Sequence, residues 1–231
     1  HNRSLVLMGG CALNCVANNI ALKYFDDVWI MPAPGDSGSS LGAVLAETET
    51  KVNWRGPYLG HNIEGDYPVD KLMNELLQGN MVGVANGRAE FGPRALGNRS
   101  LLADPRGTEV KDQVNAIKRR QEFRPFAPVV MEEHAKDIFN MPVDKSPYMQ
   151  YVIQCSKGTE YPAIIHKDGT SRVQTVNKNQ HLGLYTLLNE FYKETGCPML
   201  LNTSLNIKGY PMVNTVKDAT NFTKKYKVKV F

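Results

Sequence analysis

The chain has 231 residues, of which 42% are hydrophobic and 22% are charged, and this composition excludes a disordered chain and a short peptide module. No apolar run reaches the ~18–20 residues that cross a bilayer, and four scattered cysteines exclude a disulfide framework. The net charge of +4 is uneven, because residues 1–87 carry a net −4 and residues 88–124 a net +4, with seven of the ten arginines. Clustered arginine favours an anion site, and a solvated charged face is the alternative. We expect a soluble, cytoplasmic protein.

Residues 1–50 predict a compact α/β unit with strands and helices in alternation, at 5–8, 12–24, 28–30 and 41–50. Residues 51–67 are rich in glycine, proline and polar side chains, which indicates a linker between domains. Residues 68–231 predict a second α/β region. Its expected strands lie at 81–85, 100–103, 127–131, 149–154, 172–176 and 198–201, and its expected helices at 68–78, 109–120, 132–140, 181–195 and 218–226.

Two glycine-rich turns interrupt the first unit. Gly9 and Gly10 separate a strand from a helix, where a ligand can approach closely and the helix N-terminus attracts anions; a tight connection is the alternative. Asn14 and Asn18 are four residues apart and would share a helical face, from which amides can bond a ribose or a base. Asp36, in the second turn, is either the cap of the following helix or an exposed metal ligand.

The segment 86–100 interleaves arginines with glycines and a proline. The arginines are Arg88, Arg94 and Arg99. A surface helix has no need of this pattern, whereas a rigid loop that holds guanidinium groups around phosphate oxygens requires it. Lys118 and Arg124 extend the basic segment, and lysine supplies a point charge on a flexible stem. Basic residues interleaved with aromatic ones also fit nucleic acid, which remains the competing interpretation.

Two later segments carry polar groups at strand ends. An Asp-Gly turn follows His166 and delivers Arg172 onto a strand; His166 is either an acid–base group or a surface histidine. Asn202, Ser204 and Asn206 follow a short apolar strand, and amides and hydroxyls at a strand end suit ligand binding.

With these motifs the chain resembles the ATP-dependent O-carbamoyltransferases of the NodU/CmcH type over nearly its whole length. The segments that carry the resemblance are 87–100, 103–106, 124–128, 168–172 and 201–204. The resemblance implies an α/β fold with a mixed (α+β) sheet. Residues 1–50 would be the end of an actin-like ATPase module of the TsaD type, residues 51–67 a linker, and residues 68–231 a YrdC-like module. It also implies that the natural protein continues upstream.

In this family the YrdC-like module converts carbamoyl phosphate and ATP into carbamoyl-adenylate, and the TsaD-like module passes the carbamoyl group to an acceptor hydroxyl. By resemblance, the catalytic groups are Lys118, Arg124, Arg94, Arg172 and Ser204. The groups that bind nucleotide would be Gly9, Gly10, Asn14, Arg88, Asn202 and Asn206. Asp36 falls where the family has one ligand of iron or another divalent metal, whose partner histidines belong upstream.

The partners implied are a small molecule with a hydroxyl group and the upstream part of the same chain, with no membrane and no nucleic acid. We expect the 231 residues alone not to carbamoylate an acceptor. Two rival functions stay open, which are threonylcarbamoyl-adenylate synthesis for tRNA and a nucleic-acid-binding module.

Overall fold

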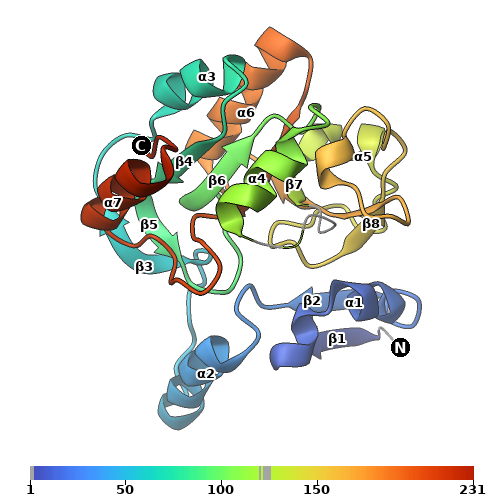
Figure 1. Ribbon diagram of the computed structural model, residues 1–231. Helices are drawn as coiled ribbons and strands as arrows, with labels where there is room; N and C mark the ends of the chain where they lie inside the picture. Colours follow the sequence, from blue (N-terminus) through green and yellow to red (C-terminus); the bar gives the residue numbers. More distant parts are fainter. Residues whose placement is uncertain (1–2, 120, 122–125) are drawn as a thin grey trace.

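The computed structural model describes residues 3–119, 121 and 126–231. The N-terminal unit contains a parallel pair of strands, β1 (Ser4–Leu7) and β2 (Asp27–Ile30), flanked by α1 (Cys15–Ala21) and α2 (Asp36–Thr48) (Figure 1). Both expected strands are therefore confirmed. The expected helix 12–24 divides into a 3-10 turn, η1 (Gly10–Leu13), and α1. The two are separate because Asn14 has an extended backbone conformation and its side chain caps the start of α1.

Helix α2 begins five residues earlier than expected, at Asp36. Gly35 is its N-cap, so the interpretation of Asp36 as the cap is wrong; its carboxylate lies in the first turn, where a negative charge is favourable. Gly38 permits the early start, since a Cβ atom there would lie only 1.9 Å from the carbonyl oxygen of Ala33. The first residues of this helix are polar or glycine, so the apolar periodicity of the sequence did not show where the helix begins.

After the connector 51–57, strand β3 (Tyr58–Ile63) pairs antiparallel with β5 (Gly87–Glu90). We expected neither strand, because both contain glycine and charged residues and lack a clear alternation of apolar side chains. Their pairing depends on a close approach of the two backbones. A Cβ atom at Gly60 would lie 2.9 Å from the Cβ of Ala89.

A five-stranded sheet forms the centre of the molecule, in the order β10-β7-β11-β6-β4. The parallel pair β10–β7 continues into antiparallel neighbours, so the expected mixed sheet is confirmed. The bounds are β4 (Val82–Ala85), β6 (Arg99–Ala103), β7 (Ala127–Met131), β10 (Gln174–Val176) and β11 (Met199–Ser204). The C-terminal residue Phe231 hydrogen-bonds to β4 through Gly83 and Ala85, which protects the sheet edge.

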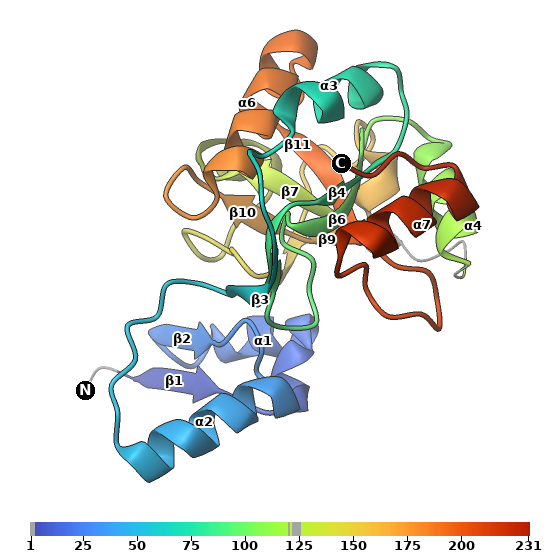
Figure 2. The same ribbon diagram turned by 90° about the vertical axis from the view of Figure 1, so that its left-hand side faces the viewer.

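Helices cover both faces of this sheet. Figure 2 shows α3 (Val69–Leu77) and α6 (Leu182–Thr195) together on one side, and α4 (Val110–Lys118) and α7 (Val216–Tyr226) on the other. The apolar face of α6 is fully buried, with Leu184, Leu187, Leu188 and Phe191 each at 0% exposure. The expected helices in these four regions are confirmed, with ends that differ by at most two residues.

Tertiary contacts divide two of the expected elements. The expected strand 172–176 becomes β9 (Thr170–Arg172), paired with β8 (Val152–Gln154), and β10, paired with β7. The expected helix 132–140 is a 3-10 turn, η2 (Glu132–His134), followed by one turn of α-helix, α5 (Ala135–Ile138). A further 3-10 turn, η3 (Pro162–Ile164), precedes β9.

The N-terminal unit contacts the loop before β8. The Asn18 amide nitrogen donates to the carbonyl oxygen of Gln150 at 2.9 Å, and the Cys15 thiol donates to that of Met149 at 3.2 Å. Within the described part of the chain, no helix is long and apolar enough to cross a membrane.

Candidate functional site

Lys118 is the last residue of α4 and its ammonium group is buried among oxygen atoms. The residue is 5% exposed. Its Nζ donates to the carbonyl oxygens of Ser204 (2.5 Å) and Asn206 (3.0 Å), with Asn206 Oδ1 at 3.0 Å and Ser204 Oγ at 3.2 Å. Lys118, from the basic segment, and Ser204 and Asn206, from the polar strand end, therefore form one group, the Lys118 cluster (Lys118, Ser204 and Asn206).

Further hydrogen bonds hold the side chains of the Lys118 cluster in place. Ser204 Oγ donates to Asn206 Oδ1 at 2.7 Å, and Asn206 Nδ2 donates to the carbonyl oxygen of Tyr210 at 3.1 Å. Helix α4 ends here because Arg119 adopts a left-handed conformation, with φ 52°. A buried ammonium ion is stable only when oxygen atoms replace its water shell. The cluster is therefore a preorganised positive charge beside two polar side chains.

Asn202 precedes the Lys118 cluster on β11 but serves the neighbouring loop. It is 1% exposed, and its Nδ2 donates to Gln174 Oε1 at 2.7 Å and to the carbonyl oxygen of Ala95 at 3.1 Å. Its Oδ1 is buried and has no partner among the described residues. Asn202 thus joins β11 to the arginine-rich loop.

The carboxylate of Glu90 fixes the shape of that loop. Its Oε1 accepts backbone N–H groups from Leu96 (2.7 Å), Asn98 (2.8 Å) and Arg99 (3.3 Å). Glu90 itself is 7% exposed, so a charged group inside the protein is stabilised by a nest of backbone donors. These hydrogen bonds hold the loop in one shape, and the sequence did not indicate that Glu90 organises it.

Arg99 is fully buried, with 0% exposure, and its guanidinium group binds backbone carbonyls. The five carbonyl oxygens that accept from it belong to Asn86 (3.0 Å), Gly87 (3.2 Å), Asn98 (2.9 Å), His61 (2.9 Å) and Asn214 (3.1 Å). Arg99 is therefore not available to phosphate, and the hypothesis that all three arginines of the loop face a ligand is wrong for this one.

The other two arginines of the segment lie elsewhere. Arg94 is half-buried against the N-terminal unit, where its Nη2 donates to the carbonyl oxygen of Leu13 at 3.4 Å. Its Nε is buried and has no partner in the described ranges. Arg88 is exposed on β5 and its Nη1 donates to the carbonyl oxygen of Gly60 at 3.4 Å. Neither hydrogen bond joins these arginines to the Lys118 cluster.

Arg172 lies on β9, opposite Val152 of β8. Close by, His166 Nδ1 lies 2.9 Å from Thr170 Oγ1, and burial, with a smaller contribution from the charge of Arg172, lowers the pKa of His166. Arg124, the remaining candidate of the basic segment, lies outside the described residues.

The two glycine-rich turns of the N-terminal unit meet each other. Gly9 N donates to the carbonyl oxygen of Pro34 at 2.6 Å. A Cβ atom at Gly9 or Gly10 would meet no heavy atom within 4 Å, so the surface here is open to a ligand. Asn14, by contrast, uses its Oδ1 to cap α1, accepting from Val16 and Ala17 at 3.2 and 3.1 Å.

Asn18 and Asp36 do not fit the roles suggested by their neighbours in sequence. Asn18 is 2% exposed and donates to the carbonyl oxygens of Ala12 and Gln150, so its amide does not face a nucleotide. Asp36 is exposed, and the described residues contain no group of three or more His, Cys, Asp or Glu side chains that could hold a metal. The side chains present here do not by themselves fit an iron site.

A partly buried histidine that the sequence did not single out supports the arginine-rich loop. The Nδ1 of His181 accepts the N–H of Leu184 at 3.1 Å, so Nε2 carries the proton and donates to Asn98 Oδ1 at 2.7 Å. The rings of Tyr58 and Tyr67 lie edge-on to it, with centroids 5.3 and 5.2 Å away. Burial lowers the pKa of His181 to about 4. The one sequence signal was its place at the start of the expected helix 181–195.

We expect this histidine to make the protein less stable in acid. Its pKa in the folded state is about 4 and its ordinary value 6.5. The stabilisation is therefore complete above pH 6.5 and is lost as the pH falls towards 4, by about 3 kcal/mol in total. Urea unfolding between pH 7 and pH 4 measures the loss.

His181→Asn is the matched variant, because asparagine keeps the helix cap and removes the titration. Its unfolding free energy should depend less on pH than that of the parent protein. Equal pH dependence in the two proteins would contradict the assignment.

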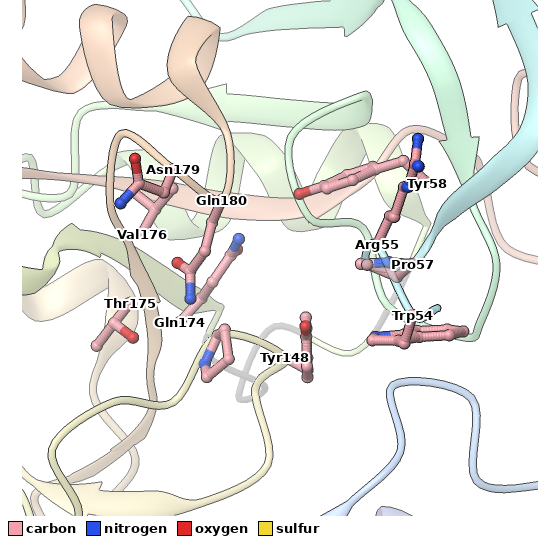
Figure 3. A pocket seen from close by; sticks show the side chains of 12 residues that line it. Trp54, Arg55, Pro57, Tyr58, Tyr148, Gln174, Thr175, Val176, Asn179 and Gln180 are labelled. Atoms are coloured by element: carbon pink, nitrogen blue, oxygen red, sulfur yellow. The ribbon is translucent and has the colours of Figure 1, made fainter. Parts of the chain in front are cut away.

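Two cavities lie beside the residues described above. A cleft of about 470 Å³ begins at Asn206 and is walled by Tyr210, Phe222 and Tyr226. A second pocket, of about 280 Å³, lies between the connector 51–57 and the end of β10 (Figure 3).

Comparisons with known proteins match both parts of the chain. Residues 73–231 match the family model described as "Carbamoyltransferase C-terminus", and residues 1–45 match "Carbamoyltransferase N-terminus". Nodulation protein NolO of Bradyrhizobium diazoefficiens is 39% identical over 93% of this chain and 45% of its own length. Nodulation protein U of Azorhizobium caulinodans is 40% identical over 90% of this chain and 40% of its own length. The chain thus spans less than half the length of these relatives.

Among solved structures, full-length HypF in a phosphate- and nucleotide-bound form aligns with a TM-score of 0.47 at 15% identity, over 72% of this chain and 21% of that one. HypF of T. kodakarensis aligns with the same TM-score at 21% identity, over 73% and 21%. The family models and the relatives do not favour the tRNA-modifying or nucleic-acid-binding functions. The chain belongs to the carbamoyltransferase family, as a C-terminal part of the NodU type.

Proposed function

We propose that the chain forms carbamoyl-adenylate as part of an ATP-dependent O-carbamoyltransferase. In the overall reaction, carbamoyl phosphate, ATP and water give carbamoyl-adenylate, phosphate and pyrophosphate. The observation that carries the proposal is the Lys118 cluster, in which a buried ammonium group, a hydroxyl and an amide converge at the end of β11.

The chemistry demands positive charge at a fixed position. Two polyanions must approach each other, and charge develops on the departing phosphate and pyrophosphate groups. A preorganised ammonium ion stabilises that charge without reorganisation at the moment of reaction. In this proposal Arg94, Arg124 and Arg172 complement Lys118 on the phosphate groups, Asn202 holds the arginine-rich loop to β11, and the cleft beside Asn206 provides room for substrate.

The finer assignments are proposals of the same kind. Residues 1–50 would be the end of a TsaD-like module, residues 51–67 the linker and residues 68–231 a YrdC-like module. The family-model matches at 1–45 and 73–231 support this division. Gly9, Gly10, Asn14 and Arg88 would bind the adenylate during transfer to an acceptor hydroxyl in the whole protein. The open surface at the glycine turn supports this role.

Isotope exchange between ATP and pyrophosphate tests the proposal on the 231-residue chain. We expect labelled pyrophosphate to enter ATP only when carbamoyl phosphate is present, since exchange requires a reversible adenylate. Threonine with bicarbonate, supplied in place of carbamoyl phosphate, serves as the control for the tRNA-modifying reaction. Exchange that depends on threonine, or no exchange with carbamoyl phosphate, would refute carbamoyl-adenylate formation.

A further inference from the structure

The pocket of about 280 Å³ has two chemically different walls. Figure 3 shows the side chains of Gln174 and Gln180 on one side and those of Tyr58 and Trp54 on the other, with Tyr148 below and between them. Pockets that bind small molecules combine apolar and aromatic walls with a few polar groups that fix orientation. This pocket has that composition.

The aromatic wall is held in place by contacts behind it. Tyr58 OH donates to the carbonyl oxygen of Leu96 at 3.1 Å, and its ring lies edge-on to His181. Tyr148 is hydrogen-bonded to the Trp54 side chain, a contact that offsets part of the rise that burial causes in the pKa of Tyr148. Fixed rings lose little conformational entropy when a ligand binds.

The wall formed by Gln174 and Gln180 keeps one hydrogen-bond donor for a ligand. Gln174 is 2% exposed and both ends are used, by Asn202 at 2.7 Å and by the carbonyl oxygen of Leu96 at 3.3 Å. Gln180 accepts the N–H of Asn177 at 3.2 Å through Oε1, and across the described residues its Nε2 has no hydrogen bond. Gln180 therefore offers an N–H donor beside the rings.

Charge narrows the class of ligand. Arg55 is the only charged residue among the lining residues, and no carboxylate lines this pocket of the described structure. A cation is disfavoured, whereas a neutral ring that bears an anionic group is favoured. Arg55 is exposed at the rim, where a phosphate group would remain partly in water.

We infer that this pocket binds the base of a purine nucleoside or nucleoside monophosphate. A planar base stacks on aromatic rings, a contact worth about 1–3 kcal/mol. The Nε2 of Gln180 can donate to a ring nitrogen of adenine, and Arg55 meets the 5′-phosphate. The pocket shares no lining residue with the Lys118 cluster, so this site does not depend on the proposed carbamoyl chemistry.

Fluorescence of Trp54 tests the inference directly. The chain has two tryptophans, so Trp29→Phe leaves Trp54 as the sole indole. In this background adenosine and AMP should quench the emission saturably. Gln180→Ala should weaken both ligands about fivefold, the effect of one lost hydrogen bond, and Arg55→Ala should weaken AMP but not adenosine. Gln78→Ala, which removes an exposed amide at the C-cap of α3, is the control and should change neither affinity.

Three results would overturn the site. They are the absence of saturable quenching by either nucleoside, quenching by N-acetylglucosamine but not by adenosine, and loss of adenosine binding in Lys118→Met. The second would identify a saccharide pocket, and the third would place the nucleoside at the Lys118 cluster. Failure of ATP–pyrophosphate exchange leaves the fluorescence result unchanged, so the two proposals fail separately.

Discussion

Arg99→Ala should destabilise the protein by about 4 kcal/mol or more, enough to unfold a large fraction of a marginally stable domain. The side chain is fully buried, and its removal would leave five backbone carbonyls without their donor. Each unpaired buried acceptor costs about 1–3 kcal/mol, although water entering the cavity recovers part of that cost. Urea unfolding followed by circular dichroism measures the loss.

Arg88→Ala is the matched control for this effect. Arg88 lies in the same segment but is exposed, with one long hydrogen bond to Gly60. Its loss should change the unfolding free energy by no more than about 0.5 kcal/mol. A similar loss in both variants would show that Arg99 does not hold the loop.

Lys118→Met should lower carbamoyl-phosphate-dependent ATP–pyrophosphate exchange by about a thousandfold. Methionine keeps the length and apolar stem of the side chain but removes the ammonium group, which the proposed reaction needs for developing phosphate charge. Loss of one preorganised electrostatic contact typically costs a factor of about 10²–10³. Initial rates of exchange at saturating ATP measure the effect.

Two comparisons separate chemistry from folding in that experiment. Lys111→Met changes a partly exposed lysine on the same helix, outside the Lys118 cluster, and should leave the exchange rate within about twofold of the parent. Unfolding of Lys118→Met in urea shows whether the folded state persists at the assay temperature. A folded Lys118→Met protein with exchange within about tenfold of the parent would contradict the role of Lys118.

The sequence predicted best those elements whose buried side chains form a pattern within a few neighbouring residues. Helix α6 has an apolar repeat whose members are all buried, and β7 is a short, wholly buried apolar run. Both patterns arise from neighbours within four residues, which a sequence displays. Strands β3 and β5 lack such a pattern, because their pairing depends on each other and on close packing at Gly60.

In the candidate site, too, the sequence indicated some groups of residues and gave no indication of others. The residue types of Lys118, Ser204 and Asn206 indicate an anion site by their chemistry, and the fold brings them within hydrogen-bond distance although 86 residues separate Lys118 from Ser204. The pocket of about 280 Å³ gave no such signal, since its rings and amides come from three separate segments.

The sequence alone determined the family resemblance, the α/β class and the residue types that could meet phosphate. Only the tertiary structure decided which arginine is committed to the protein's own backbone. Arg88, Arg94 and Arg99 are equivalent in charge and nearly adjacent in the chain, yet one is exposed, one contacts the N-terminal unit and one is fully buried among carbonyls. The physical reason is that the acceptors of Arg99 include carbonyls of His61 and Asn214, which only folding brings together.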